Sequence, residues 1–461
     1  MATSIHGKDY LSLAAYSNCK TRVIDLQPLA IPESGSDDVY RQVYQDYTKV
    51  VVPGSNRDLL RRAVESIKYG IAPPVAFPTE TVYGLGADAT NTSSVAGIFA
   101  AKGRPNDNPL IVHVSSSEHL QRVIGEPLPA HYNLAIERFW PGPMTILLPV
   151  PANSRFAPNV HPEQNTIGFR MPSSKYARFF IAACDRAIAG PSANSSGKPS
   201  PTTAQHVLDD LSGKINFILD GGNCDVGVES TVVDGLHDPP LILRPGGVSL
   251  EELRQIGGIW AETAIAYNLH HSPSSPSTPA SDLYVENTNG APRAPGMKYR
   301  HYSPAGKLVL FSHAALQGGK AEEYLSTLVK SQQFDGKAKR IGFISWSSPK
   351  FLGVPSTSDS EIPQLDTEVV EQSHYVDSIS VASYGKETES QALLVDVAIR
   401  PTIADLAKEL FGVLRLFDNL KCDYIFAELV QRRDGLPAAS GQVWDAVADR
   451  LGKAASETIE E

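Results

Sequence analysis

Apolar residues recur along this chain in short runs and in helical stripes, and their order predicts an α/β fold. Helices are predicted over 55–70, where Gly70 is suited to end the helix, and over 92–102, with Thr92 as N-cap. Short apolar or alternating runs bounded by Pro, Gly and Asp predict strands at 75–77, 110–114, 144–149, 166–171, 215–219, 230–234 and 241–243. Helices are predicted between them at 118–123, 133–139, 203–211 and after Ser249, which can form a capping box with Glu252.

The same patterns divide the chain into four regions. Residues 1–54 are weakly patterned apart from a hint of one strand, and we interpret them as an N-terminal leader. Residues 55–265 are predicted to form one α/β domain with a twisted, mixed sheet. Residues 266–305 are rich in Ser, Pro, Asn and Gly, which is typical of a linker. Strands alternating with helices predict a smaller Rossmann-like α/β domain over 306–461.

Composition and charge narrow the class of protein. The 461 residues carry 41 Lys and Arg against 51 Asp and Glu, a net charge of −10, which argues against a nucleic-acid backbone as the main ligand. The four cysteines show no CxxC spacing and so indicate neither a disulfide scaffold nor a structural zinc site. No apolar run approaches the roughly 18 residues that span a bilayer. We therefore expect a cytoplasmic protein without a membrane partner; the first 50 residues resemble a transit signal poorly, and a mitochondrial fraction stays open.

Three strands carry polar side chains that could serve a ligand. In strand 166–171 a period of two puts Thr166, Gly168 and Arg170 on the face opposite three apolar side chains. Arg170 could be an ordinary surface residue, but the small Gly168 beside it leaves room for a ligand. His113 is the only polar residue of strand 110–114, where a hydrogen-bonded core residue is the commoner alternative to a ligand contact. Ser230 opens strand 230–234 in a similar way.

Four cations stand at segment ends or on a strand face without carboxylates nearby in the sequence: Lys102, Arg104, Arg170 and Arg244. Such a set suits a polyphosphate, although Lys102 alone could simply complement a helix dipole. The turn 191–197 (PSANSSG) offers hydroxyl, amide and backbone N–H groups to an anion or a nucleobase, or is an ordinary serine-rich turn. The glycine patterns of nucleotide loops and the patterns of zinc hydrolases and serine esterases are absent, so we predict no protein-bound metal.

Eight short segments, in this order, resemble the YrdC-like family of L-threonylcarbamoyl-AMP synthases. They are 78–85 (PTETVYGL), 102–105 (KGRP), 108–113 (NPLIVH), 140–143 (WPGP), 170–172 (RMP), 191–194 (PSAN), 229–234 (ESTVVD) and 244–246 (RPG). Each segment alone is common, whereas their compact succession over about 55–260 is specific. The segment 295–302 (PGMKYRHY) and the α/β region after it look like the longer, two-domain form of this enzyme. Ser174 is a departure, because the family often has His there.

The resemblance implies a nucleotidyltransferase that joins L-threonine, bicarbonate and ATP into threonylcarbamoyl-AMP and releases pyrophosphate. The product would pass to the tRNA threonylcarbamoyl transferase machinery, which makes N6-threonylcarbamoyladenosine next to the anticodon. Mg²⁺ would arrive with ATP instead of occupying a dedicated protein cage. A carbamate of threonine would attack the α-phosphate in line while cations stabilise the leaving pyrophosphate, without a covalent nucleophile.

The resemblance also implies roles for individual residues. It places Lys102, Arg104, Ser192 and Asn194 at the catalytic centre. The ATP-binding residues would be Lys102, Asn106, Thr166, Ser192, Ser200, Arg244 and Tyr302. L-Threonine would be held by Thr79, His113, Arg170 and Ser230, with Arg170 as the clamp, because a guanidinium binds a carboxylate bidentately.

The end of the linker is expected to act as a lid, because the carbamate is unstable in water and the site must close. Tyr302 would contact phosphate, and deletion of 296–303 would cripple adenylate formation. One alternative is a module that binds RNA through the same cations, against which the net charge of −10 argues, although weak RNA binding could accompany the activity. Another is a carbamoyl-adenylate enzyme like the hydrogenase maturation proteins, whose acylphosphatase and zinc-finger segments this chain lacks.

Overall fold

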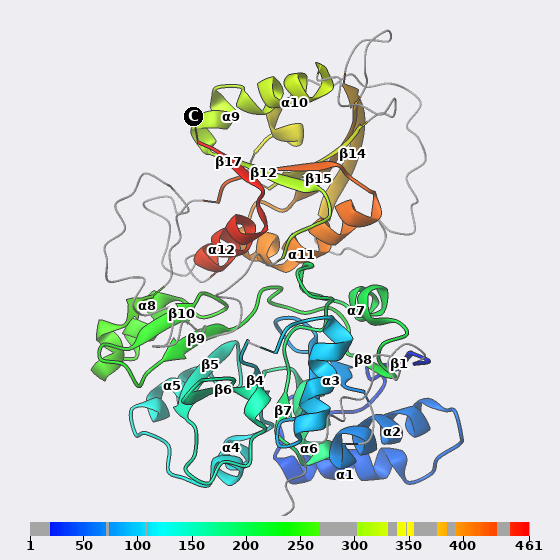
Figure 1. Cartoon of the computed structure of the whole chain (residues 1–461), viewed down its shortest axis with the longest axis vertical. Coiled ribbons are helices and arrows are strands. Elements are labelled where there is room, and N and C mark those ends of the chain that lie inside the picture. The colour runs from blue at the N-terminus through cyan, green and yellow to red at the C-terminus, as the bar shows by residue number, and fades with distance from the viewer. Residues whose placement is uncertain are drawn as a thin grey trace, which may run out of the picture.

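The computed structural model describes residues 19–460 except 71–72, 107, 267–301, 331–338, 347, 355–375, 385–391 and 431–442. Two β-sheets organise two regions of the chain, one in the lower and one in the upper half of Figure 1. Within these described ranges no helix combines the length and the apolar character needed to cross a membrane. Most of the predicted linker lies outside the described residues.

The first sheet is mixed and has eleven strands, in the order β1-β8-β2-β3-β7-β4-β6-β5-β9-β10-β11. Parallel pairs such as β4 with β6 alternate with antiparallel pairs such as β5 with β6, which confirms the predicted twisted mixed sheet. The strands are β1 (Arg22–Asp25), β2 (Val75–Phe77), β3 (Gly84–Asp88), β4 (Ile111–His113), β5 (Met144–Pro149), β6 (Thr166–Arg170), β7 (Ile188–Ala189), β8 (Phe217–Asp220), β9 (Thr231–Asp234), β10 (Leu241–Arg244) and β11 (Ala264–Ile265).

The described residues of this region form eight α-helices, and all of them except α1 and α6 lie where the sequence predicts a helix. They are α1 (Asp37–Thr48), α2 (Asn56–Tyr69), α3 (Thr92–Lys102), α4 (Ser117–Ile124), α5 (Tyr132–Phe139), α6 (Lys175–Cys184), α7 (Ala204–Leu211) and α8 (Leu250–Gln255). Gly70 ends α2 in the left-handed conformation, and Ser249 forms the predicted capping box. The N-cap of α3 is Asn91 and not Thr92, because the Asn91 carboxamide accepts the hydrogen bond from the Ser94 amide.

The interpretation of residues 1–54 as a separate leader is wrong for the part that the structure describes. Strand β1 pairs in parallel with β8, and helix α1 packs on α6. Ile24, Leu26 and Tyr40 are fully buried in the same cluster as residues of α2 and α6. The pattern of 37–48 is mostly polar, so its single buried stripe was not recognised in the sequence.

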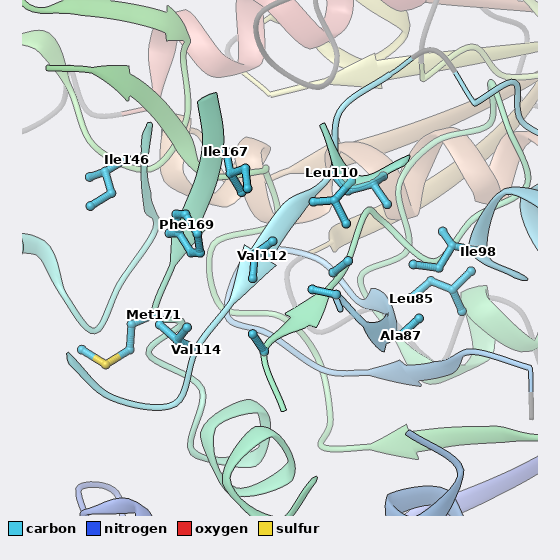
Figure 2. Packing of buried hydrophobic residues seen from close by; sticks show 14 of the residues in the cluster. Leu85, Ala87, Ile98, Leu110, Val112, Val114, Ile146, Ile167, Phe169 and Met171 are labelled. Carbon is cyan, nitrogen blue, oxygen red and sulfur yellow. The ribbon is translucent and has the colours of Figure 1, made fainter. Parts of the chain in front are cut away.

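The two faces of β6 separate the core from the site. Ile167, Phe169 and Met171 are buried in a hydrophobic cluster that also holds Val112 and Ile146 (Figure 2), which confirms the apolar face predicted for this strand. Alternation along the strand then turns Arg170 to the opposite face.

The second sheet has six strands, in the order β14-β15-β13-β16-β12-β17, and only β14 runs antiparallel to its neighbour. Its strands are β12 (Lys307–Phe311), β13 (Lys339–Ser345), β14 (Val376–Tyr384), β15 (Ala392–Ile399), β16 (Tyr424–Glu428) and β17 (Glu457–Ile459). Its helices are α9 (His313–Gln317), α10 (Lys320–Lys330), α11 (Ile403–Asn419) and α12 (Trp444–Ala454). Parallel strands joined through helices confirm the Rossmann-like architecture.

Helices α11 and α12 lie on the side of the second region that faces the first (Figure 1). Val82 and Val228 of the first region share a hydrophobic cluster with Leu410 and Phe411 of α11. At Gly227 an added Cβ would lie 2.4 Å from the Ala407 carbonyl oxygen, so this glycine permits the backbones to touch. The two regions therefore share part of one core.

Candidate active site

The polar residues singled out in the sequence meet in one pocket of about 790 Å³, part of which is open to solvent. The candidate residues that line the pocket are Thr79, Lys102, Arg104, His113, Arg170, Ser192, Asn194, Ser200, Ser230, Arg244 and Tyr302. Most of these residues lie in the loops after β2 and β7, at the end of α3 and at the ends of β4, β6 and β10. One edge of the sheet therefore supplies most of the site.

Two candidate residues are not in the pocket lining. Asn106 is exposed in the loop after α3, and Thr166 is half-buried at the first position of β6. Thr166 lies four positions before Arg170, which is about 13 Å along an extended strand. Their contact with ATP stays a prediction.

Lys102 is the last residue of α3, and it pins the serine-rich turn. Its ammonium donates to the carbonyl oxygens of Ser192 (2.5 Å) and Asn194 (2.7 Å) and lies 3.3 Å from Asn194 Oδ1. The Ser192 hydroxyl donates to the same Oδ1 at 2.6 Å. Burial first, and the charge of Arg104 next, lower the pKa of Lys102 well below its usual value. Three acceptors thus hold a buried amine in place beside the pocket.

Arg170 is buried in a pair with a carboxylate that the sequence did not reveal as its partner. Its Nη2 lies 2.7 Å from Glu80 Oε1, and its Nε donates to the Gly142 carbonyl oxygen at 3.3 Å. Only 4% of the Arg170 side chain is exposed, which rules out the surface-residue alternative. A substrate carboxylate at this guanidinium would have to share it with Glu80.

His113 is both packed in the core and exposed to the pocket, the two alternatives that the sequence allowed. Its ring packs edge-on against Phe77, and it lines the pocket. Burial, and next the charge of Arg170, lower the pKa of His113 to about 3. The imidazole is therefore neutral at pH 7 and can bind a ligand only by hydrogen bonds, not by charge.

Ser230, directly before β9, and Arg244, the last residue of β10, lie next to each other. Arg244 Nη2 donates to the Ser230 carbonyl oxygen at 2.8 Å, and the Ser230 hydroxyl lies 2.8 Å from Thr145 Oγ1. The backbones approach so closely that a Cβ on Gly246 would lie 2.2 Å from the Thr231 nitrogen. Glycine is required at this point of the RPG segment for steric reasons.

The described end of the linker is fixed between the two regions. Tyr302 is buried, stacks on Phe411 of α11 with ring centroids 5.2 Å apart, and lines the pocket. The Ser303 amide donates to the Gly197 carbonyl oxygen at 2.9 Å. Residues 298–301 of the predicted lid lie outside the described residues.

The sequence did not reveal several pocket residues of the first region, nor a partner that one of them has in the second region. Thr81, Lys198 and Glu229 also line the pocket, and Glu229 binds Arg450 of α12 at 2.8 Å. Glu229 stands directly before Ser230 in the segment 229–234, and an acid next to an apolar strand could have indicated a pocket residue. Nothing in the sequence near Arg450 indicated a contact 221 residues away.

The fold and pocket define a two-region α/β protein whose cation-lined site lies at one edge of a mixed sheet, next to helices α11 and α12 of a second, Rossmann-like region. A family model described as telomere recombination matches residues 72–246, and one described as the C-terminal domain of threonylcarbamoyl-AMP synthase matches 248–456. The chain therefore belongs to the threonylcarbamoyl-AMP synthase family, in its two-domain form.

Relatives cover nearly the whole chain. The threonylcarbamoyl-AMP synthase of Schizosaccharomyces pombe is 36% identical over 96% of this chain and 98% of its own length. The one of Pyrococcus abyssi is 37% identical over 84% of this chain and 91% of its own. A crystal structure of P. abyssi Sua5 complexed with L-threonine superposes with a TM-score of 0.66, at 31% identity, and covers 96% of this chain and all of that one.

Proposed function

We propose that this chain is an L-threonylcarbamoyladenylate synthase, a nucleotidyltransferase that makes threonylcarbamoyl-AMP and pyrophosphate from L-threonine, bicarbonate and ATP. The observation that carries the proposal is the convergence of Lys102, Arg104, Arg170 and Arg244 in one pocket beside hydroxyl groups. Membership of the family supports the same reaction. The product is then used to modify tRNA next to the anticodon, by a transferase machinery in the cytoplasm.

The charges in the pocket suit anionic substrates. ATP, bicarbonate and the threonine carboxylate are all anions, and guanidinium groups bind phosphate and carboxylate oxygens in pairs. Glu229 is the one acid among the described residues that line the pocket, and it is already bound by Ser200 and Arg450. The pocket residues therefore fit phosphates better than a bare cation. Mg²⁺ would arrive bound to ATP and would supply further positive charge for the phosphates.

Threonine occupies the end of the pocket near β4 and β6. Arg170 binds its carboxylate, while Thr79, Ser230 and the neutral His113 accept or donate hydrogen bonds to its polar groups. These three residues carry no net charge at pH 7, so Arg170 is the one cation among the four residues proposed for threonine. Condensation of the threonine amine with bicarbonate forms the C–N bond, breaks one C–O bond of bicarbonate and releases water. The resulting carbamate then attacks phosphorus through an oxygen atom.

ATP occupies the end near the serine-rich turn and the end of α3. Lys102 and Arg104 reach its phosphates, while Ser192, Asn194 and Ser200 bind the rest of the nucleotide. The carbamate oxygen attacks the α-phosphate, the bond to pyrophosphate breaks, and the cations stabilise the charge that leaves. Tyr302, at the rim of the pocket, contacts phosphate and helps to exclude water during the reaction.

Pyrophosphate release tests this function directly. The purified chain is incubated with ATP and Mg²⁺, with and without L-threonine and bicarbonate, and the nucleotides are separated by chromatography. We expect pyrophosphate and a new adenylate peak only when both co-substrates are present. Intact ATP, or ADP in place of the adenylate, would contradict the proposal.

A further inference from the structure

One arginine of the second region reaches the wall of the pocket. Arg450 of α12 is completely buried, and its Nε donates to Glu229 Oε2 at 2.8 Å. Its Nη2 donates to the Pro245 carbonyl oxygen at 3.0 Å, and its Nη1 to Asp449. The guanidinium also lies 5.3 Å from the centre of the Tyr302 ring. Arg450 thus connects α12 to two residues that line the pocket, Glu229 and Tyr302, and to the backbone directly after Arg244.

Glu229 transmits this contact to the nucleotide end of the pocket. Its second oxygen, Oε1, accepts the hydroxyl of Ser200 at 2.6 Å, and all three side chains are buried. Burial raises the pKa of Glu229, but the charges of Arg450 and Arg244 and its hydrogen bonds outweigh burial and lower the pKa below its usual value. Glu229 is therefore a carboxylate at neutral pH, directly beside the site proposed for a polyanion.

A second arginine, Arg415 of α11, binds the loop 195–200 that carries Ser200. Arg415 Nη2 donates to the Pro199 carbonyl oxygen at 2.5 Å and lies 2.9 Å from Asp210 Oδ2. Asp210 also accepts from Lys198 and from the Ser195 amide. The loop 195–200, which carries Ser200, is thereby tied to both helices of the second region that face it.

Removal of the Arg450 charge would leave the buried Glu229 carboxylate with Arg244 as its main remaining cation. A buried carboxylate without its partner is strongly unfavourable. The acid, compensated by fewer cations, would then repel the nucleotide phosphates.

We propose that Arg450 is a positioning residue for nucleotide binding: it neutralises Glu229, so that this acid does not repel the phosphates of ATP and Ser200 stays oriented. The second region then contributes to the reaction through a charge held inside the pocket wall, without touching a substrate. This inference rests on the proposed function, because it assigns the pocket end with Glu229 and Ser200 to ATP.

A double-mutant cycle separates this role from simple packing. The variants are Arg450→Met, Glu229→Gln and the double variant, since the glutamine side chain keeps an oxygen for Ser200 but carries no charge. The matched control is Arg340→Met, which removes an arginine of the same region that binds the Leu420 carbonyl oxygen and lies outside the pocket. KM for ATP and for L-threonine is measured by pyrophosphate release, and folding by urea denaturation.

We expect Arg450→Met to raise KM for ATP about tenfold or more and KM for threonine less than about threefold. Adding Glu229→Gln should bring KM for ATP back to within about threefold of the Glu229→Gln value, because the charge to be neutralised is gone. Arg340→Met should leave both KM values unchanged. If Arg450→Met does not fold, Arg450→Gln, which keeps an amide donor without charge, replaces it under the same criteria.

Two results would overturn the inference. One is a KM for ATP in Arg450→Met equal to that of the Arg340→Met control. The other is a defect that persists in the double variant, which would make Arg450 a packing residue. Failure of the wild-type chain to form the adenylate would instead overturn the proposed function, so the two failures are distinguishable.

Discussion

Replacement of Arg170 by lysine tests the proposed carboxylate clamp at the threonine end of the pocket. Arg170 lies 2.7 Å from Glu80 and donates to the Gly142 carbonyl oxygen, and its side chain also lines the pocket. Lysine keeps one positive charge for Glu80, which avoids the cost of about 3–5 kcal/mol that follows when a buried pair loses one partner. Lysine lacks the planar fork that binds a carboxylate with two hydrogen bonds.

The expected loss follows from one hydrogen bond between charged groups. Such a bond contributes about 1.5–3 kcal/mol. At about 1.4 kcal/mol per factor of ten, kcat/KM for L-threonine should fall by about 10- to 150-fold. The nucleotide end keeps all of its contacts, so kcat/KM for ATP at saturating threonine should change by less than about threefold.

The assay measures pyrophosphate release against threonine concentration at saturating ATP and bicarbonate, together with urea denaturation of each variant. Arg186→Lys is the matched control, because Arg186 pairs with Asp88 at 3.3 Å in the same region and does not line the pocket. An unchanged kcat/KM for threonine in Arg170→Lys, or a larger loss for ATP than for threonine, would refute the clamp and assign Arg170 to the nucleotide.

Three further outcomes follow from the same geometry. Lys102→Met should abolish measurable pyrophosphate release, since it removes a cation proposed to bind phosphate. It also leaves the carbonyl oxygens of Ser192 and Asn194 without their donor, which should lower the free energy of unfolding in urea by about 1–3 kcal/mol for each oxygen. His113 binds a proton only in the unfolded chain between pH 6.5 and about 3, so the free energy of unfolding falls as the pH falls. Between pH 7.5 and 5 the free energy of unfolding of His113→Gln should fall by about 2 kcal/mol less than that of the wild type. Equal decreases in the two proteins would contradict the low pKa of His113. Gly246→Ala should give little folded protein by circular dichroism, because the added Cβ would clash with the Thr231 backbone. A normal amount of folded protein would show that this backbone can move away.

Much of the secondary structure could be predicted because the strands are short apolar runs with clear ends. Strands β2 and β5 have the residue ranges that the pattern predicts. Helix α6 was missed because its residues from Ala177 to Cys184 are all buried, so no polar face alternates with an apolar one. Strand β3 was missed because Gly84 and Gly86 weaken the strand pattern, although the ring of Phe77 fills the space beside both glycines.

Most pocket residues could be named from the sequence because they lie in short segments with turn-forming neighbours. Their partners could not, since ion pairs join positions far apart in the chain. Glu80 meets Arg170 across the first sheet region, and Glu229 meets Arg450 across the boundary between the two regions. Periodicity reports which face a residue occupies, whereas such pairs depend on how the two regions pack together.

These pairs explain how a pocket for several anions can also be a stable part of the core. Cations gathered in a buried space repel one another and lose hydration. Glu80 offsets the charge of Arg170, and backbone carbonyl oxygens hold the Lys102 ammonium. Glu229 could do the same for Arg244, but an unrestrained carboxylate there would also repel ATP. Binding of Glu229 by Arg450 keeps this acid within the wall, so the packing of α12 against the first region sets the charge that a nucleotide meets.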